Sequence, residues 1–244
     1  MIEPDQSHGD AAPAATDPTG TDPAGDPEDG RSGRKGSLWR ELPILVGVAI
    51  VVALLVRTFV FQSFWIPSGS MENTLQRGDR VLVNKLVYDF ADPERGEVVV
   101  FVSPMQWRSD PDDEDFIKRI IAVGGDTVSY DAEDRRIRVN GQLVDESAYL
   151  YRDPIDGHRD LPSRNDVEFS VTVPPGRLWV MGDHRSASGD SRENYLRSDG
   201  DVRLATIPVD AVVGKAFVVM WPLDRWDWLT VPDGFDDVPK TGGT

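Results

Sequence analysis

The chain has 244 residues, a formal net charge of −16 and no cysteine. The acidic excess argues against nucleic-acid binding, because phosphate repels carboxylates and affinity depends on clustered Lys and Arg. The absence of cysteine excludes thiol catalysis, disulfides and Cys-ligated zinc. At this length we expect one domain, or two small ones, with a sizeable core.

Residues 1–36 form an acidic tail that is rich in Asp, Pro, Gly, Ala and Thr and has almost no large apolar side chain. Such a segment cannot bury enough apolar surface to offset the entropy lost on ordering, so it is predicted to be disordered. Its end and the residues just after it are basic: Arg31, Arg34, Lys35 and Arg40.

An apolar run follows over Leu42–Val56 and resumes after Arg57 as far as Ile66. A membrane span needs roughly 20 apolar residues, which this run supplies if Arg57 snorkels toward the surface. We predict a transmembrane anchor over 37–62, with the tail cytoplasmic and the rest of the chain outside, because the basic flank precedes the span. A buried soluble helix and a cleavable signal peptide are the alternatives, and the basic flank and the lack of a small-residue cleavage pair disfavour them.

The remainder is patterned as short β-strands rich in β-branched residues and bounded by Gly, Pro or Asp. The predicted strands are Arg80–Tyr88, Glu97–Val102, Phe116–Val123, Asp126–Tyr130, Glu168–Val173, Leu178–Met181 and Val212–Trp221, with a hairpin over Ile137–Val144 that turns at Asn140-Gly141. The expected fold is mostly β. It comprises an antiparallel sheet domain over 63–130 and 178–230, a small β subdomain or loop insertion over 131–177, and a flexible C-terminus over 231–244.

A candidate nucleophile lies directly after the apolar run, in the sequence Pro-Ser-Gly-Ser-Met over 67–71. Pro and Gly flank the serines as a sharp exposed turn requires, and such a turn can present the Ser70 hydroxyl together with a backbone N–H for an oxyanion. The alternative is a plain linker, although the apolar Ile66 and Met71 beside the turn are unnecessary in a hydrophilic linker.

A serine nucleophile needs a base, and both His and Lys remain open. Of the three histidines only His184 lies in a dense polar stretch outside the tail, which allows a Ser70–His184–Asp triad. A lysine must be desolvated to act while neutral. Lys85 and Lys118 each share a strand face with apolar residues, so periodicity does not separate them, and each could also be a snorkelling surface lysine.

Four motifs in order resemble the bacterial type I signal peptidases, the peptidase S26 family. They follow the predicted anchor as IPSGSMENTL over 66–75, GDRVLVNKLVY over 78–88, FIKRIIAVGGD over 116–126 and GDHRSASGDSR over 182–192. The resemblance covers nearly the whole chain after the tail. It implies a serine endopeptidase of the bacterial plasma membrane, with a single pass, that acts on secretory preproteins delivered by the export machinery.

The resemblance also assigns roles to residues. It implies Ser70 as nucleophile and Lys118 as general base, with Ser188 orienting the lysine and Ser68 completing an oxyanion hole with the Ser70 N–H. It implies a substrate pocket of Ile66, Met71, Leu75, Phe116 and Ile117, and a structural charge network of Asp183, Arg185, Asp190, Arg192 and Arg119. No metal and no organic cofactor is implied. The sequence departs from the common family pattern at Asn73, Phe116, Gly124 and His184.

Two rivals remain at this point. One is a Ser–His–Asp hydrolase that uses His184. The other is a membrane-tethered β-domain that only binds partners. A self-cleaving repressor could share a Ser–Lys dyad, but the predicted span and the acidic charge argue against it.

Overall fold

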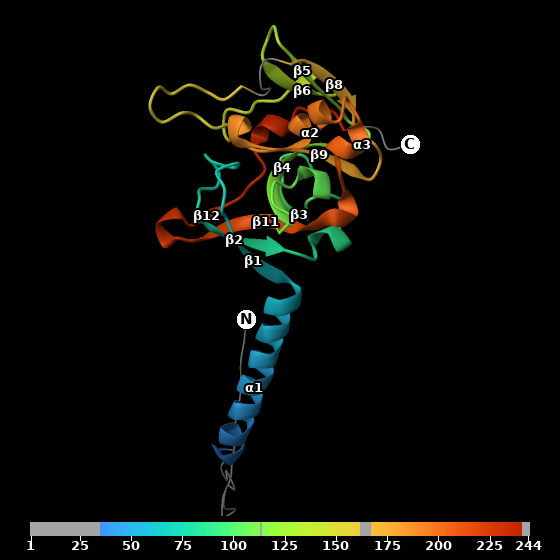
Figure 1. The fold of residues 1–244 in the computed structure, drawn as a ribbon. Helices are drawn as coiled ribbons and strands as arrows, with labels where there is room; N and C mark the ends of the chain where they lie inside the picture. The colour runs from blue at the N-terminus through green and yellow to red at the C-terminus, as the bar shows by residue number, and fades with distance from the viewer. Residues whose placement is uncertain (1–34, 113, 162–166, 241–244) are drawn as a thin grey trace, which may run out of the picture. The chain divides into compact units, whose positions relative to one another are not determined.

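The computed structural model describes residues 35–112, 114–161 and 167–240 (Figure 1). Residues 1–34 of the tail that is predicted to be disordered over 1–36 lie outside the described residues. The chain divides into two units at Val46, and all strands belong to the second unit. The mostly antiparallel β fold expected from the sequence is confirmed.

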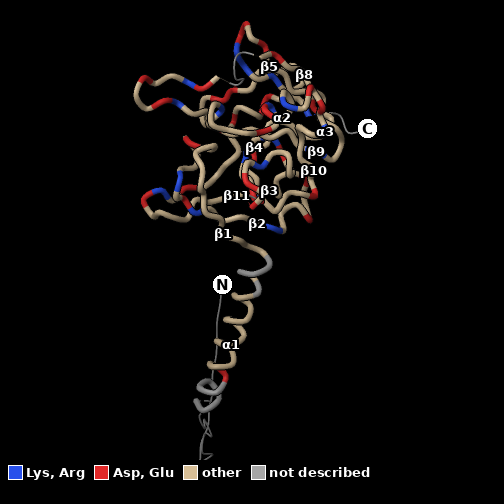
Figure 2. The backbone as a smooth tube through the Cα atoms, in the orientation of Figure 1, with Lys and Arg blue, Asp and Glu red and all other residues tan. Residues whose placement is uncertain are grey.

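Helix α1 (Lys35–Phe59) contains the first part of the apolar run, Leu42–Val56, and the part after Arg57 continues into strand β1 (Phe61–Trp65). Its described side chains after Glu41 carry no charge (Figure 2) and are exposed, among them Ile44 and Leu45. Within the part of the chain that the structure describes, no helix is long and apolar enough to cross a membrane. The anchor over 37–62 therefore stays a prediction.

The larger sheet has the order β1-β2-β11-β3-β4-β9-β10, with β12 paired to β11, and every pairing is antiparallel. Its strands are β1 (Phe61–Trp65), β2 (Arg80–Asn84), β3 (Val98–Val102), β4 (Asp115–Val123), β9 (Arg177–Met181), β10 (Ile207–Pro208), β11 (Val212–Trp221) and β12 (Asp227–Trp228). Two short helices, α2 (Ser191–Arg197) and α3 (Val202–Ala205), follow β9. Strand β4 lies inside the sheet between β3 and β9, so its side chains are flanked on both sides.

The smaller sheet has the order β7-β6-β5-β8 and lies at the end of the body away from β1 (Figure 1). Its strands are β5 (Thr127–Asp131), β6 (Arg136–Val139), β7 (Gln142–Leu143) and β8 (Phe169–Thr172). The predicted hairpin is present, with Val139 opposite Gln142 and positive φ at both Asn140 and Gly141. The subdomain differs from the expected 131–177 because β5 pairs with β6 and β8 instead of joining the main sheet.

Residues 231–240 are packed, which differs from the flexible C-terminus expected from their polar composition. Phe235 and Val238 are buried in the core cluster shared with the smaller sheet. Arg95 donates to the carbonyl oxygens of Val238 at 3.2 Å and Pro239 at 3.0 Å. These two apolar side chains pack the segment against the core, but two residues are too few to form a recognisable sequence pattern.

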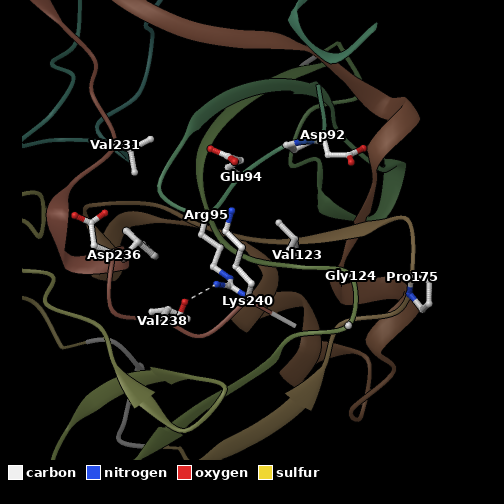
Figure 3. A pocket seen from close by; sticks show the side chains of 13 residues that line it. Asp92, Glu94, Arg95, Val123, Gly124, Pro175, Val231, Asp236, Val238 and Lys240 are labelled. Carbon is white, nitrogen blue, oxygen red and sulfur yellow. Dashed lines mark hydrogen bonds between the residues drawn. The ribbon is translucent and has the colours of Figure 1, made fainter. Parts of the chain in front are cut away.

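A cavity of about 730 Å³ lies beside this segment (Figure 3). It is bounded by the loop before β3, the turn after β4 and the C-terminal residues: Asp92, Pro93, Glu94, Arg95, Val123, Gly124, Gly125, Pro175, Val231, Phe235, Asp236, Val238 and Lys240. Arg95, a partly buried cation of the lining, is already paired with Asp126 at 2.7 Å. Neither Ser70 nor Lys118 lines this cavity, so it is separate from the site described next.

Candidate active site

The Pro-Ser-Gly-Ser turn after β1 is held as an ordered loop. Ile66 closes the loop at its base, because its N–H donates to Asp79 O and its carbonyl accepts from Gly78 N, both at 2.9 Å. Met71 and Leu75 are fully buried and fix the far side of the turn. Ser70 itself is 6% exposed. A plain linker has no such anchors, so the structure favours a shaped turn.

Lys118 on β4 reaches the Ser70 hydroxyl. The distance from Lys118 Nζ to Ser70 Oγ is 2.7 Å, and Nζ is also 3.0 Å from the carbonyl oxygen of Ile117. Lys118 is 4% exposed, and burial lowers its pKa from 10.5 to about 8, against the opposing influence of Asp190 and Asp183. A buried amine with a lowered pKa can be neutral near physiological pH and accept a proton.

The other lysine left open by periodicity is not at the site. Lys85 is partly exposed and lies just past the end of β2, and none of the hydrogen bonds of the described residues joins it to Ser70. Strand register makes the distinction, since Lys118 lies opposite Val99 within the sheet. Lys215, a lysine not considered from the sequence as a base, is bound to Glu97 at 2.6 Å.

The groups predicted to assist the pair are close to it. Ser68 Oγ lies 3.4 Å from Ser70 Oγ, and none of the hydrogen bonds of the described residues uses the backbone N–H of Ser70. The Ser188 hydroxyl is buried and has no hydrogen-bond partner among the described residues. Gly182 lies between these groups, because a Cβ there would be 2.4 Å from both Ser188 Oγ and Ser70 O. Only glycine permits this approach.

The predicted pocket residues form the packed rear of the site. Ile66, Met71 and Leu75 are 2%, 0% and 0% exposed and belong to one core cluster with Ile117. Phe116 is partly exposed, and its ring centroid lies 5.5 Å from Lys118 Nζ. These side chains therefore sit behind and beside Ser70 and Lys118 as a tightly packed apolar layer.

The predicted charge network consists of buried ion pairs. Arg119 forks onto Asp183 at 2.9 and 2.7 Å, and Arg192 does the same onto Asp190 at 2.9 and 2.6 Å. Arg185 pairs with Glu146, from the segment after β7.

Two partners in this network received no role from the sequence. Glu146 lies in a featureless polar stretch, and Thr74 donates to Asp183 at 2.5 Å, which ties the nucleophile loop to the last motif. Their roles depend on contacts 39 and 109 residues away in the chain.

His184 does not contact the Ser70 hydroxyl. Its Nδ1 lies 3.1 Å from Gly69 O and 3.0 Å from Glu72 Oε2, and its Nε2 is 3.9 Å from Asp160 Oδ2. The geometry therefore gives Ser70 a lysine partner and leaves the Ser–His–Asp alternative without its central hydrogen bond. Among the described residues no group of three or more His, Asp or Glu side chains is arranged to hold a metal ion.

Comparison with known proteins agrees with the motifs. The family model described as signal peptidase, peptidase S26, matches residues 39–221. A signal peptidase I of Mycobacterium tuberculosis is 38% identical over 251 residues, 89% of this chain and 83% of that protein. A probable signal peptidase I of Mycobacterium leprae is 38% identical over 234 residues, 79% of each protein.

A crystal structure of a signal peptidase I from Enterococcus faecalis V583 covers 51% of this chain and 97% of its own, at 24% identity and a TM-score of 0.35. On the family match and the two mycobacterial relatives, the chain belongs to the signal peptidase family, peptidase S26. The predicted family is thereby confirmed.

Proposed function

We propose that this chain is a membrane-anchored serine endopeptidase that removes N-terminal signal peptides from exported preproteins with a Ser70–Lys118 dyad. The observation that carries the proposal is the 2.7 Å contact between Lys118 Nζ and Ser70 Oγ. The burial that lowers the pKa of Lys118 to about 8 supplies the neutral amine that the chemistry needs.

The reaction is acyl transfer. Neutral Lys118 takes the proton of Ser70 while Oγ attacks the scissile carbonyl carbon. The Ser70 N–H and the Ser68 hydroxyl bind the oxyanion of the tetrahedral intermediate. Lys118 then gives the proton to the leaving amine as the C–N bond breaks. Water, deprotonated by Lys118, hydrolyses the Ser70 ester and frees the second product, and Ser188 orients the lysine throughout.

Specificity follows from the apolar layer behind the dyad. A peptide bound as an extended strand places residues two apart on the same side. The residue before the cut and the one two positions earlier then face the edge of this layer at Phe116 and Ile117, with Ile66, Met71 and Leu75 packed behind them. A large side chain there displaces packed core atoms, and a charged one is desolvated. Cleavage after A-x-A-like sequences, with a permissive middle position, is the expected outcome.

The location of the reaction follows from the anchor and from the substrate. A single pass through the bacterial plasma membrane, N-terminus inside, holds the catalytic domain outside, at the bilayer surface where an exported preprotein emerges from the export machinery. The lipid bilayer and the preprotein are then the two partners. No metal, cofactor or nucleic acid takes part in the proposed chemistry.

The test is incubation of the purified full-length chain with a preprotein, followed by N-terminal sequencing of the product. Ser70→Ala and Lys118→Ala are each expected to lower kcat by several powers of ten, as for residues that act as one unit. Lys85→Ala is the matched control and should cleave at close to the wild-type rate. Near wild-type cleavage by Lys118→Ala would show that the dyad is wrongly assigned.

A substrate series tests the specificity separately. Phe in place of the small residue before the cut should abolish cleavage, whereas substitution of the middle residue should change the rate only modestly. If both outer positions tolerate Phe or Lys, the signal-peptide assignment fails even with Ser70 as the nucleophile.

A further inference from the structure

His184 holds the nucleophile loop on both sides of Ser70. Its side-chain Nδ1 lies 3.1 Å from Gly69 O, and its backbone N–H donates to Ser70 O at 3.2 Å. The first carbonyl belongs to the peptide group that precedes Ser70 and the second to the peptide group that follows it. One residue therefore contacts both peptide planes that meet at the Cα atom of the nucleophile, and the Glu72 N–H also donates to Gly69 O at 3.0 Å.

The environment of the ring defines which nitrogen carries a proton. Gly69 O can only accept, and so can the carboxylate of Glu72, whose Oε2 is 3.0 Å from Nδ1. Nδ1 must therefore be the protonated nitrogen and the donor. Tyr151 stacks on the ring with centroids 3.8 Å apart and planes 18° apart, and the side chain is only 16% exposed. The ring is thus held in place, and its one Nδ1–H is shared between Gly69 O and Glu72 Oε2.

The orientation of the Gly69 carbonyl also sets the orientation of the Ser70 N–H, which belongs to the same peptide group. A peptide unit is planar and trans, so its C=O and N–H point in opposite directions. Fixing Gly69 O consequently fixes the Ser70 N–H, which no described group accepts. A hydrogen bond to the carbonyl also polarises the amide and strengthens its N–H as a donor.

We infer that His184 is a positioning residue that aims the Ser70 backbone N–H at the developing oxyanion. The inference depends on the proposed function, because it assigns an N–H of the same site. His184 does not act as a base in this role. A neutral ring suffices, and the Asn side chain offers an amide donor that can replace it in part.

The test compares His184→Ala, His184→Asn and the matched control His158→Ala in the full-length protein, with a preprotein-derived peptide as substrate. His158 is exposed, and its backbone hydrogen bonds are to Asp153 and Asp156, not to the nucleophile loop. Complete loss of an oxyanion donor costs about 10²–10³ in kcat, and a misaimed donor should cost less. His184→Ala is expected to lower kcat about 10- to 100-fold with KM within about threefold of wild type.

The same experiment contains two further readouts. His184→Asn should recover most of kcat, and the pH midpoint of His184→Ala should equal that of wild type, since Lys118 is untouched. If His184→Ala lowers both kcat and the thermal unfolding midpoint, and His184→Asn restores neither, the role of His184 is merely structural and the inference is overturned. His158→Ala should match wild type throughout.

The double variant His184→Ala/Glu72→Gln removes one rival cause. Without the His184 ring, the Glu72 carboxylate loses its contact beside Gly69, keeps the 4.0 Å contact with Arg77, and would repel the oxyanion by itself. If that charge causes the loss, the double variant regains wild-type kcat and the inference fails. If positioning causes it, the double variant stays as slow as His184→Ala.

A spectroscopic measurement separates this inference from the proposed function. In protein labelled with ¹³C-carbonyl glycine, the Gly69 signal should shift in His184→Ala and not in His158→Ala, whatever the activity. An unmoved Gly69 signal, or a moved signal with unchanged kcat in a cleaving enzyme, overturns the inference. If the Gly69 signal moves but the wild-type chain shows no Ser70-dependent cleavage, the proposed function is refuted instead. The inference then fails as well, because no oxyanion forms at the Ser70 N–H.

Discussion

Burial of Lys118 sets the pH range in which the proposed dyad can act. Its pKa is lowered from 10.5 to about 8, chiefly by desolvation. Below that value the amine is protonated and cannot take a proton from Ser70. We therefore expect kcat/KM to rise about tenfold per pH unit below pH ~8 and to level off above it. A pH–rate profile of the full-length enzyme checks this, and a midpoint near 10.5 would contradict the desolvated base.

Local sequence could not distinguish Lys118 from Lys85. Both lysines alternate with apolar neighbours, so both could face a core. Burial, however, depends on the strands on either side, and β4 has β3 and β9 as neighbours whereas Lys85 follows the end of β2. Only the resemblance to a family separated the two before the structure did. The close approach of Gly182 to Ser188 and Ser70 likewise depends on tertiary packing, which the sequence does not show.

Asn73 is a residue at which this chain departs from the common family pattern, and its backbone explains why. Its φ is +90°, in the left-handed region that Asn tolerates better than most residues and that proline, fixed near −65°, cannot adopt. Asn73→Pro should destabilise the loop by about 1–3 kcal/mol and lower kcat. Asn73→Gly should be close to neutral in urea unfolding. Equal stability of the two variants would contradict the conformation.

At the scale of elements, the strands were more predictable than their partners. The short β-branched runs and the Asn-Gly hairpin identified most strands, because alternation and turn chemistry are local properties. The assignment of Asp126–Tyr130 to the main sheet differs from the structure, because β5 pairs with β6 and β8 in the smaller sheet. Partner choice is decided by long-range packing. No element was predicted over Ser191–Arg197, where the structure has helix α2, capped by Asp190.

The buried Arg185–Glu146 pair joins two elements, the segment after β7 and the last motif. Arg185 is 2% exposed and Glu146 is 6% exposed. Removing one partner leaves a buried unpaired charge, so Glu146→Ala should cost about 3–5 kcal/mol of unfolding free energy. The double variant Glu146→Leu/Arg185→Met should recover most of it. Urea unfolding measures both, and an additive loss in the double variant would contradict a desolvated pair.

At the scale of the whole molecule, the prediction concerns how the chain is placed in a membrane. The basic residues lie before the apolar run, with Lys35 and Arg40 closest to it. Positive charge on the cytoplasmic flank sets orientation. The acidic body, by contrast, is not drawn to anionic lipid by its charge, so in the proposed arrangement the anchor alone holds it at the bilayer.

Protease added to intact cells or to right-side-out vesicles should therefore degrade an epitope after Thr244 while an epitope before Met1 stays protected. The expected pattern follows from one crossing after the basic flank, because a second crossing would return the C-terminus to the protected side. Detergent is the control, since both epitopes should then be lost. As a matched variant, replacing Arg31, Arg34, Lys35 and Arg40 with Gln should weaken the orientation and protect a fraction of the C-terminal epitope. A C-terminal epitope that is protected in the wild-type chain would refute the single-pass arrangement, and with it the extracytoplasmic site, without affecting the contact between Lys118 and Ser70.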